Sequence, residues 1–284
     1  MQFFTLKIVN TAGEVFELTH NTKDYVIRSI GGLTRPATNI NTSTGAGDGT
    51  YYNSSKLQQR NIVIDLVIRG DIESNRQQLY RIFPLKTACT VYFQNHNRNV
   101  KIQGYVETID GDLFVDREEI QISIICPRPY FESLHTIYTE LSKIVRMFEF
   151  PFSIQVGEPI PFSERRNLPL CSIVNNGDAE CGLILTVATS GEVQDLKIYH
   201  TATPQFLGFD YSFQAGDQIT VNTLTGQKKL TLLRDDEEIN LLSYMQPGSS
   251  WFQLTVGIND FTFTASNQDF VRILFATTEL FGGV

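Results

Sequence analysis

The feature that most constrains the fold is a series of short apolar runs, separated by turn residues, along most of the chain. In the second half, turn signals such as Asn176-Gly177-Asp178 and Gly216-Asp217 separate about nine strand-like runs, which predict a two-sheet β-sandwich of jelly-roll type. The expected strands are Ser172–Asn175, Leu183–Ala188, Leu196–Tyr199, Phe206–Phe213, Ile219–Thr223, Lys229–Leu233, Trp251–Val256, Phe261–Thr264 and Val271–Phe275.

The first half predicts strands on both sides of one helix. Alternating apolar residues indicate an opening hairpin, and the run from Ile62 to Ile68 is apolar on both faces, as in a central strand. Asp71 or Ser74 can cap a short helix that stops at Pro84, and strand signals return from Thr90 to about Cys126. This order predicts an N-terminal β-sandwich of α+β type.

A change in pattern marks the boundary between the halves. The Pro127-Arg128-Pro129 segment disfavours both ladder and helix, and apolar residues at helical spacing then predict a linker helix over 133–148. Four further prolines keep the chain irregular until about Leu170. We therefore expect an N-terminal domain over 1–130, a linker with a short helix over 131–168, and a C-terminal domain over 169–284.

Charge excludes one large class of function. The formal net charge is −8, and the halves differ: residues 1–135 hold 14 basic and 14 acidic side chains, whereas residues 136–284 hold 9 and 17. Because phosphate contacts supply most nucleic-acid affinity, the lack of a basic stripe argues against a sequence-specific nucleic-acid partner. The first residues do not resemble a secretory signal, and no apolar stretch has spanning length, so we expect synthesis in the cytoplasm and no membrane insertion.

No catalytic or cofactor-binding motif is found. The chain lacks a nucleophile elbow, a Walker loop, an H-E-x-x-H helix and an EF-hand loop. Its four cysteines lie apart from its four histidines, which favours buried free thiols over a zinc site. We interpret the acidic groups at 116–119 and 235–238 as solvated surface. The expectation is a protein that is not an enzyme and has no catalytic residue, metal or cofactor.

Trp251 is the one candidate for a sugar-binding platform, since it is the only tryptophan. A core or rim position is the favoured interpretation. An exposed ring would instead support the alternative function, a carbohydrate-binding module that recognises host cell-wall polymers.

The segment over 31–55 is the least explained by ordinary folding. It is rich in Gly, Thr and Asn, and loops of this length inside compact domains are uncommon. It is either a mobile surface loop or an arm that adds to a neighbouring subunit. In the second case, the side chains buried between subunits would be Leu33, Pro36, Ile40, Tyr51 and Tyr52.

The order of motifs along the chain resembles the distal tail protein family of long-tailed bacteriophages. The first half contributes RNIVIDLVIRGDIESNRQQLYRIFPL, VKIQGYVETI and EEIQISIICPRPYF. The second half contributes FEFPFSI, LPLCSIVNNGDAECG, QAGDQITVNTLTGQKKLTLL, WFQLTVGINDFTFTA and the closing FGGV. Each motif is weak alone, but their collinear order spans essentially the whole chain.

The resemblance implies a fold, a place and partners. It implies an N-terminal β-sandwich with one helix and a protruding arm, which lies where this family carries its belt, and a C-terminal galectin-like sandwich. It also implies a homohexameric ring in the virion tail tip, joining the tail tube to the baseplate and adsorption apparatus. The implied partners are the chain itself, the major tail tube protein, a tail tip or tail-associated lysin protein, and a receptor-binding protein on the C-terminal domain.

Overall fold

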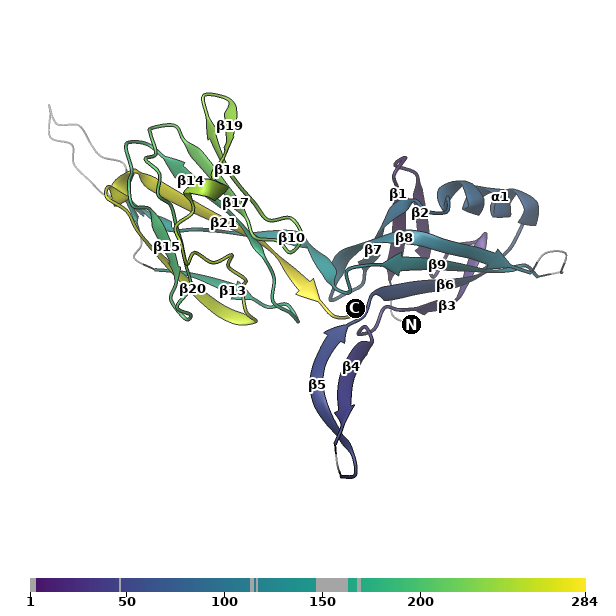
Figure 1. Cartoon of the computed structure of the whole chain (residues 1–284). Coiled ribbons are helices and arrows are strands. Elements are labelled where there is room, and N and C mark those ends of the chain that lie inside the picture. Colours follow the sequence, from purple (N-terminus) through teal and green to yellow (C-terminus); the bar gives the residue numbers. More distant parts are fainter. Residues whose placement is uncertain (1–3, 46, 113–114, 116, 147–162, 168–169) are drawn as a thin grey trace, which may run out of the picture. The chain divides into compact units, whose positions relative to one another are not determined.

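The chain forms two compact units. The structure is a computed structural model that describes residues 4–45, 47–112, 115, 117–146, 163–167 and 170–284 (Figure 1). Unit 1 comprises residues 1–134 together with 280–284, and unit 2 comprises residues 135–279. Both crossings between units therefore fall inside strands, one in β10 (Phe131–Glu140) and one in β21 (Val271–Phe281).

Antiparallel strands in the order β2-β1-β7-β8-β9-β6-β3 build unit 1. The bounds are β1 Thr5–Asn10, β2 Val15–Thr19, β3 Tyr25–Gly31, β6 Arg60–Ile68, β7 Ala88–Gln94, β8 Asn99–Gly111 and β9 Glu119–Cys126. The predicted opening hairpin, the predicted central strand and the strands that follow the helix are confirmed.

Strand β8 turns the corner between the two layers of unit 1. Its first half pairs with β7 and its second half with β9, and the register shifts between Val106 and Thr108. A β-bulge at this place increases the bend of a strand. Gly104 precedes it, and a Cβ there would lie 2.5 Å from Cγ2 of Ile124. Only glycine allows β9 to approach β8 so closely.

The predicted helix is α1 (Ile72–Ile82). The Asp71 side chain accepts a hydrogen bond from Ser74 N and so caps the first turn. The helix buries Leu79 and Ile82, which belong to the unit 1 core together with Ile62, Ile64, Leu66 and Ile68 of β6. No helix among the described residues is both long enough and apolar enough to cross a membrane.

Unit 2 is a β-sandwich, as expected. One sheet has the order β19-β18-β17-β14-β21 and the other has the order β13-β20-β15-β16. Their remaining bounds are β13 Cys171–Asn175, β14 Leu183–Thr189, β15 Lys197–His200, β16 Phe206–Gly208, β17 Gln218–Asn222, β18 Lys229–Arg234, β19 Glu237–Asn240 and β20 Gly257–Thr264. Fully buried phenylalanines fill the core, among them Phe209, Phe213, Phe252, Phe261 and Phe275.

Three expectations are corrected by the structure. The helix predicted over 133–148 is wrong: its described part forms β10 and the hairpin strand β11 (Ser142–Arg146), which pairs with β12 (Ser163–Asn167). The run Trp251–Val256 is not a strand, because its ladder is reduced to one bridge between Cys181 and Leu254. Residues 280–284, expected in the C-terminal domain, lie in unit 1. Much of the predicted linker, 147–162 and 168–169, lies outside the described residues.

Candidate interaction surface at the β4–β5 arm

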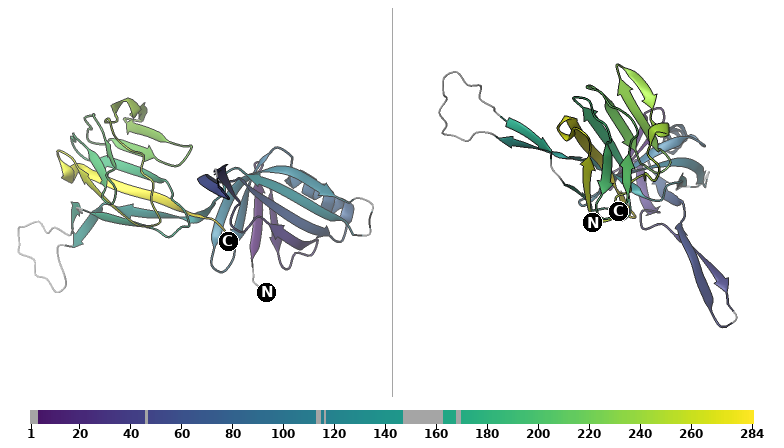
Figure 2. Two further views of the ribbon diagram at one scale, coloured as in Figure 1. Left: turned by 60° about the horizontal axis from the view of Figure 1, so that its bottom comes forward. Right: turned by 60° about the vertical axis from the view of Figure 1, so that its left-hand side comes forward.

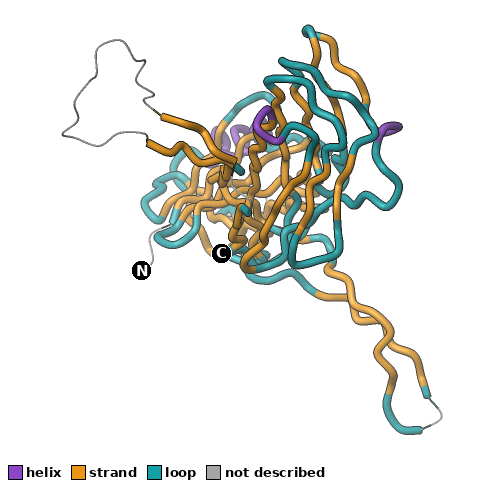
Figure 3. Tube along the Cα trace, turned by 90° about the vertical axis from the view of Figure 1, so that its left-hand side faces the viewer, coloured by secondary structure: helices purple, strands orange, loops and turns teal. Residues whose placement is uncertain are grey.

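The segment predicted as a loop or an arm is a two-stranded hairpin, which we call the arm (Thr38–Leu57). Strand β4 (Thr38–Thr44) pairs with β5 (Thr50–Leu57), and together they form a separate sheet. The register shifts between Asn41 and Thr42, as at a β-bulge. Three views show the hairpin extending away from the sheets of unit 1 (Figures 1, 2 and 3).

Every residue of both arm strands is exposed. The side chains include four large apolar or aromatic groups: Tyr51 is 68% exposed, Tyr52 65%, Ile40 59% and Leu57 38%. An isolated two-stranded hairpin is marginally stable in water, because it has no hydrophobic face to bury. The arm therefore has the backbone order of a strand pair without the core that normally supports one.

The other two arm candidates lie at the base instead. Leu33 is half-buried and packs against the core of unit 1, and Pro36 is also half-buried. The hairpin closes just beyond them, where Gln58 N donates a hydrogen bond of 2.9 Å to Ala37 O. Of the five candidates, the structure thus brings Ile40, Tyr51 and Tyr52 together on the arm and separates Leu33 and Pro36 from them.

A glycine sets the path of the chain into the arm. Gly32 has a φ of +78°, a conformation that other residues rarely adopt. A Cβ on Gly32 would also lie 1.9 Å from Asn61 O. Both facts require glycine where the chain leaves β3.

A buried arginine, which the sequence analysis did not identify, holds the same base. Arg60 is 2% exposed at the start of β6, and its partners are main-chain carbonyls. Its Nε donates to Pro129 O at 2.9 Å, its Nη1 donates to Gly32 O and Thr34 O, and its Nη2 donates to Gly282 O at 2.6 Å. No local pattern reveals this contact set, because its members are far apart in the sequence.

In unit 2, the structure places Trp251 at half-buried depth, and Lys228 Nζ lies 5.7 Å from its ring centroid. A separate shallow groove of about 360 Å³ lies elsewhere, lined by side chains of β14, β17, β18 and β19 that include Gln218, Thr220, Asn222 and Lys229. Trp251 is not among the lining residues.

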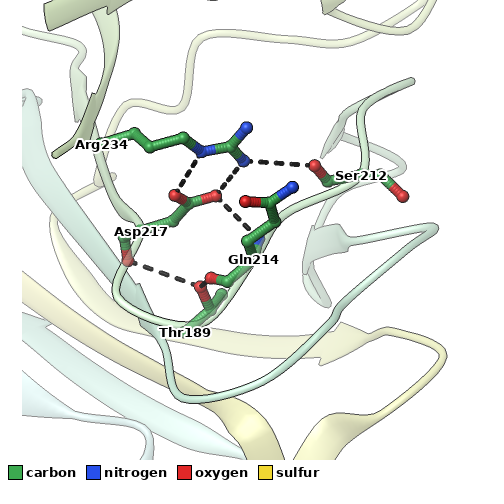
Figure 4. A network of polar contacts seen from close by, with 5 residues as sticks. All are labelled: Thr189, Ser212, Gln214, Asp217 and Arg234. Carbon is green, nitrogen blue, oxygen red and sulfur yellow. Dashed lines mark hydrogen bonds and ion pairs between the residues drawn. The ribbon is translucent and has the colours of Figure 1, made fainter. Parts of the chain in front are cut away.

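A buried ion pair fixes the turn before β17 (Figure 4). Asp217 is 1% exposed and accepts hydrogen bonds from Arg234 Nε at 2.7 Å and from Gln214 N at 2.8 Å. Its main-chain oxygen accepts a bond from Thr189 N at 3.0 Å. Burial raises the pKa of Asp217, but the bonds from Arg234 and Gln214 outweigh burial, so the net pKa is lowered. The pair is structural, since these contacts tie the turn before β17 to the ends of β14 and β18.

Among the described residues, no group of three or more His, Cys, Asp or Glu side chains could hold a metal ion. All four cysteines are free and buried, as expected, and burial raises the pKa of Cys89 and Cys171 to about 11 and of Cys126 to about 12. Glu118, expected to be solvated, is instead 3% exposed and paired with Arg76.

Comparison with known protein families gives a match within unit 2. Residues 176–278, inside unit 2, match the family model of the siphovirus-type tail component, C-terminal domain. A search of curated proteins finds no match.

A solved structure is similar over nearly the whole length of the chain. The crystal structure of the phage SPP1 Dit protein, titled a paradigm of the hub adsorption apparatus in phages that infect Gram-positive bacteria, is similar with a TM-score of 0.68 and 15% identity. The match covers 97% of this chain and 99% of that chain. A chain of the phage P2 baseplate in its activated conformation with Ca has 12% identity and a TM-score of 0.47 over 98% of both chains. Residues 176–278 of unit 2 are thus similar to the siphovirus-type tail component family, and the chain as a whole has the fold of the SPP1 Dit protein.

Proposed function

We propose that this chain is the hub of a phage tail tip, where it assembles as a homohexameric ring between the tail tube and the baseplate. The observation that carries the proposal is the fully exposed arm, with Ile40, Tyr51 and Tyr52 at its surface. An arm of this kind is completed by a neighbour that supplies an apolar surface and main-chain hydrogen bonds. A second copy of the chain is that neighbour in this proposal.

In this proposal the arm contacts a different patch on the next copy. The fully exposed strands β4 and β5 reach outward from unit 1 and are available for such a contact. Contacts between two different patches are heterologous, and they close into rings when the rotation permits. Six copies are the number that the resemblance to distal tail proteins implies.

The remaining partners follow from the same position in the tail. Unit 1 would meet the major tail tube protein on one side and a tail tip or tail-associated lysin protein on the other. Unit 2 would hold a receptor-binding protein. The acidic surplus of residues 136–284, with 17 acidic and 9 basic side chains, favours a partner with a basic face. We place the protein in the virion tail after synthesis in the host cytoplasm, with no enzymatic role.

The assembly is tested by removing the arm. Because Ala37 and Gln58 are hydrogen-bonded across the base, residues 38–57 can be replaced by two glycines without displacing either end. Light scattering of the wild-type chain should give six times the 32.1 kDa of one copy, with rings in electron micrographs. The arm-deleted chain should stay folded and monomeric.

A matched pair of variants separates the arm from general surface effects. Tyr51→Ser combined with Tyr52→Ser should weaken the ring, whereas Tyr138→Ser, at a tyrosine that is 67% exposed on β10, should leave it intact. A wild-type chain that remains monomeric at tens of micromolar, or an arm-deleted chain that still forms hexamers, would contradict the proposal.

One observation favours a second candidate, binding of host cell-wall carbohydrate by unit 2. The shallow groove on the β14-β17-β18-β19 sheet offers amide, hydroxyl and ammonium groups at strand positions that face outward. Trp251 is a weaker candidate contact, because Lys228 lies over its ring. Glycan-array binding that is lost in Gln218→Ala with Asn222→Ala would support this candidate, and loss in Trp251→Ala would assign the site to the tryptophan. A chain that binds no glycan excludes it.

A further inference from the structure

The base of the arm contacts a segment that is far from it in sequence, residues 281–284, which we call the latch. Val284 N donates a hydrogen bond of 3.1 Å to Leu33 O. Gly283 lies against the same stretch, since a Cβ built on it would be 3.4 Å from Leu33 O and from Arg35 N. The latch thus runs along the main chain that leads into β4.

Two arginines hold the latch in place. The Arg98 guanidinium lies 3.8 Å from the ring centroid of Phe281, which is 8% exposed in the unit 1 core. Arg60 donates to Gly282 O and, with the same guanidinium, to Gly32 O and Thr34 O of the arm base. One side chain therefore bridges the latch and the base directly.

The chemistry of Arg60 explains why the bridge is rigid. A guanidinium has five N–H donors in a fixed plane, and here Nε, Nη1 and Nη2 serve four carbonyl oxygens from three separate segments. Its Cζ also lies 4.4 Å from the ring centroid of Phe131. A lysine has one nitrogen and no planar fork, so it cannot span the same oxygens.

The latch is the continuation of a strand that begins in unit 2. Strand β21 (Val271–Phe281) belongs to unit 2 as far as Glu279 and enters unit 1 at Leu280. The arm has no core of its own, and its base is the place where it joins unit 1. The segment that contacts this base is thus the continuation of the last strand of unit 2.

We propose that residues 281–284 and Arg60 form a latch that fixes the base of the β4–β5 arm. With the latch closed, the arm leaves unit 1 in one direction. With the latch released, Leu33–Ala37 becomes a flexible hinge and the arm loses its direction. Strand β21 is then a covalent route by which a change in unit 2 reaches the arm.

Hydrogen exchange tests the latch without any assembly. Two variants open it from opposite sides: Arg60→Lys removes the fork, and deletion of 282–284 removes the segment that the fork holds. Each lost hydrogen bond should speed the local opening that exposes residues 31–37 to exchange, by about tenfold. Exchange in the β6 core, residues 62–68, should stay unchanged, and Arg81→Lys, at a side chain that is 70% exposed, is the matched control.

The deletion variant decides the outcome. If it folds and residues 31–37 exchange at the wild-type rate, the latch is refuted. If it fails to fold, Val284→Pro replaces it, because proline removes the N–H that bonds Leu33 O and leaves Phe281 and Gly282 in place. Wild-type exchange over 31–37 in that variant refutes the latch equally, and faster exchange supports it.

The effect on assembly rests on the proposed ring and is scored separately. Latch variants should form fewer rings than the wild type at the same concentration, because a flexible arm loses more conformational entropy when it binds the next copy. Faster exchange at the base in a chain that never forms rings would support the latch and refute the ring. Normal ring formation despite a loosened base would show that the latch does not direct the arm.

Discussion

Strands β5 and β6 are consecutive along the chain, yet they are opposite in burial. Every residue of β5 (Thr50–Leu57) is exposed, whereas β6 (Arg60–Ile68) buries every second side chain, with Ile62 and Ile64 at 0% exposure. Both contain good strand formers, so strand propensity does not separate them. The difference is the apolar alternation of β6, which gives it a face to bury inside its own unit. β5 has no such face within its own unit, and its side chains stay exposed.

The largest expected loss of stability comes from truncating a buried side chain of β6. Ile64→Ala should lower the free energy of unfolding of unit 1 by about 2–5 kcal/mol, because it leaves a cavity in a fully packed core. Urea unfolding monitored in unit 1 measures it. A loss below about 1 kcal/mol would show that β6 is not the central strand of a tight core.

A smaller effect is expected at the buried charges of unit 2. Asp217→Asn leaves the part-exposed Arg234 without its carboxylate and should cost roughly 2 kcal/mol at pH 7. Because the folded-state pKa of Asp217 is lowered, its stabilisation is complete above the usual value of 3.8 and is lost as pH falls through the folded value. Thermal unfolding from pH 7 to pH 2 should show a weaker acid dependence in Asp217→Asn. Equal acid dependence in both proteins would exclude the ion pair as its source.

The buried thiols should make the stability of unit 1 fall at alkaline pH. The folded pKa of Cys89 is raised from 9.0 to about 11 by burial, so its contribution is complete below pH 9 and is lost between about pH 9 and pH 11. Wild-type unit 1 should lose roughly 1 kcal/mol of stability per such thiol between pH 8 and pH 10. Cys89→Ala should show a smaller loss over that range in paired urea titrations. An unchanged slope would mean that Cys89 does not resist ionisation.

The smallest effect on stability is expected on the arm. Tyr51→Ser with Tyr52→Ser should change the free energy of unfolding of the isolated chain by no more than about 0.5 kcal/mol, because neither ring is buried. Calorimetry of the dilute chain measures this. A clear destabilisation would mean that the tyrosines pack on their own chain, and the contrast between β5 and β6 would disappear.

Much of the fold follows from local patterns. The isoleucine alternation of β6 predicted a central strand, and Asp71 with Pro84 bounded the helix closely. Helical spacing misled at 133–148, because the same apolar positions also fit strands: Phe131 and Ser133 alternate inward on β10, and Leu141 is buried just before β11. At Trp251–Val256, Phe252 and Leu254 alternate into the core, but too few ladder partners lie alongside to make a strand.

The candidate site was predictable only in part. The lack of apolar residues marked the arm as unusual, but the pairing of its two halves and the exposure of Ile40, Tyr51 and Tyr52 needed the structure. Leu33 could not be told from these by composition, since its packing depends on the tertiary position of the base. Arg60 and the latch join residues 32, 60, 129 and 282, and such long-range contacts leave no local signal.

The central claim is that another copy of the chain completes the arm. Hydrogen exchange over residues 38–57, measured on the assembled and on the diluted chain, tests it most directly. We predict strong protection of β4 and β5 in the assembly and rapid exchange after dissociation, while the β6 core stays protected in both. Equal exchange of the arm in the two states would contradict the account.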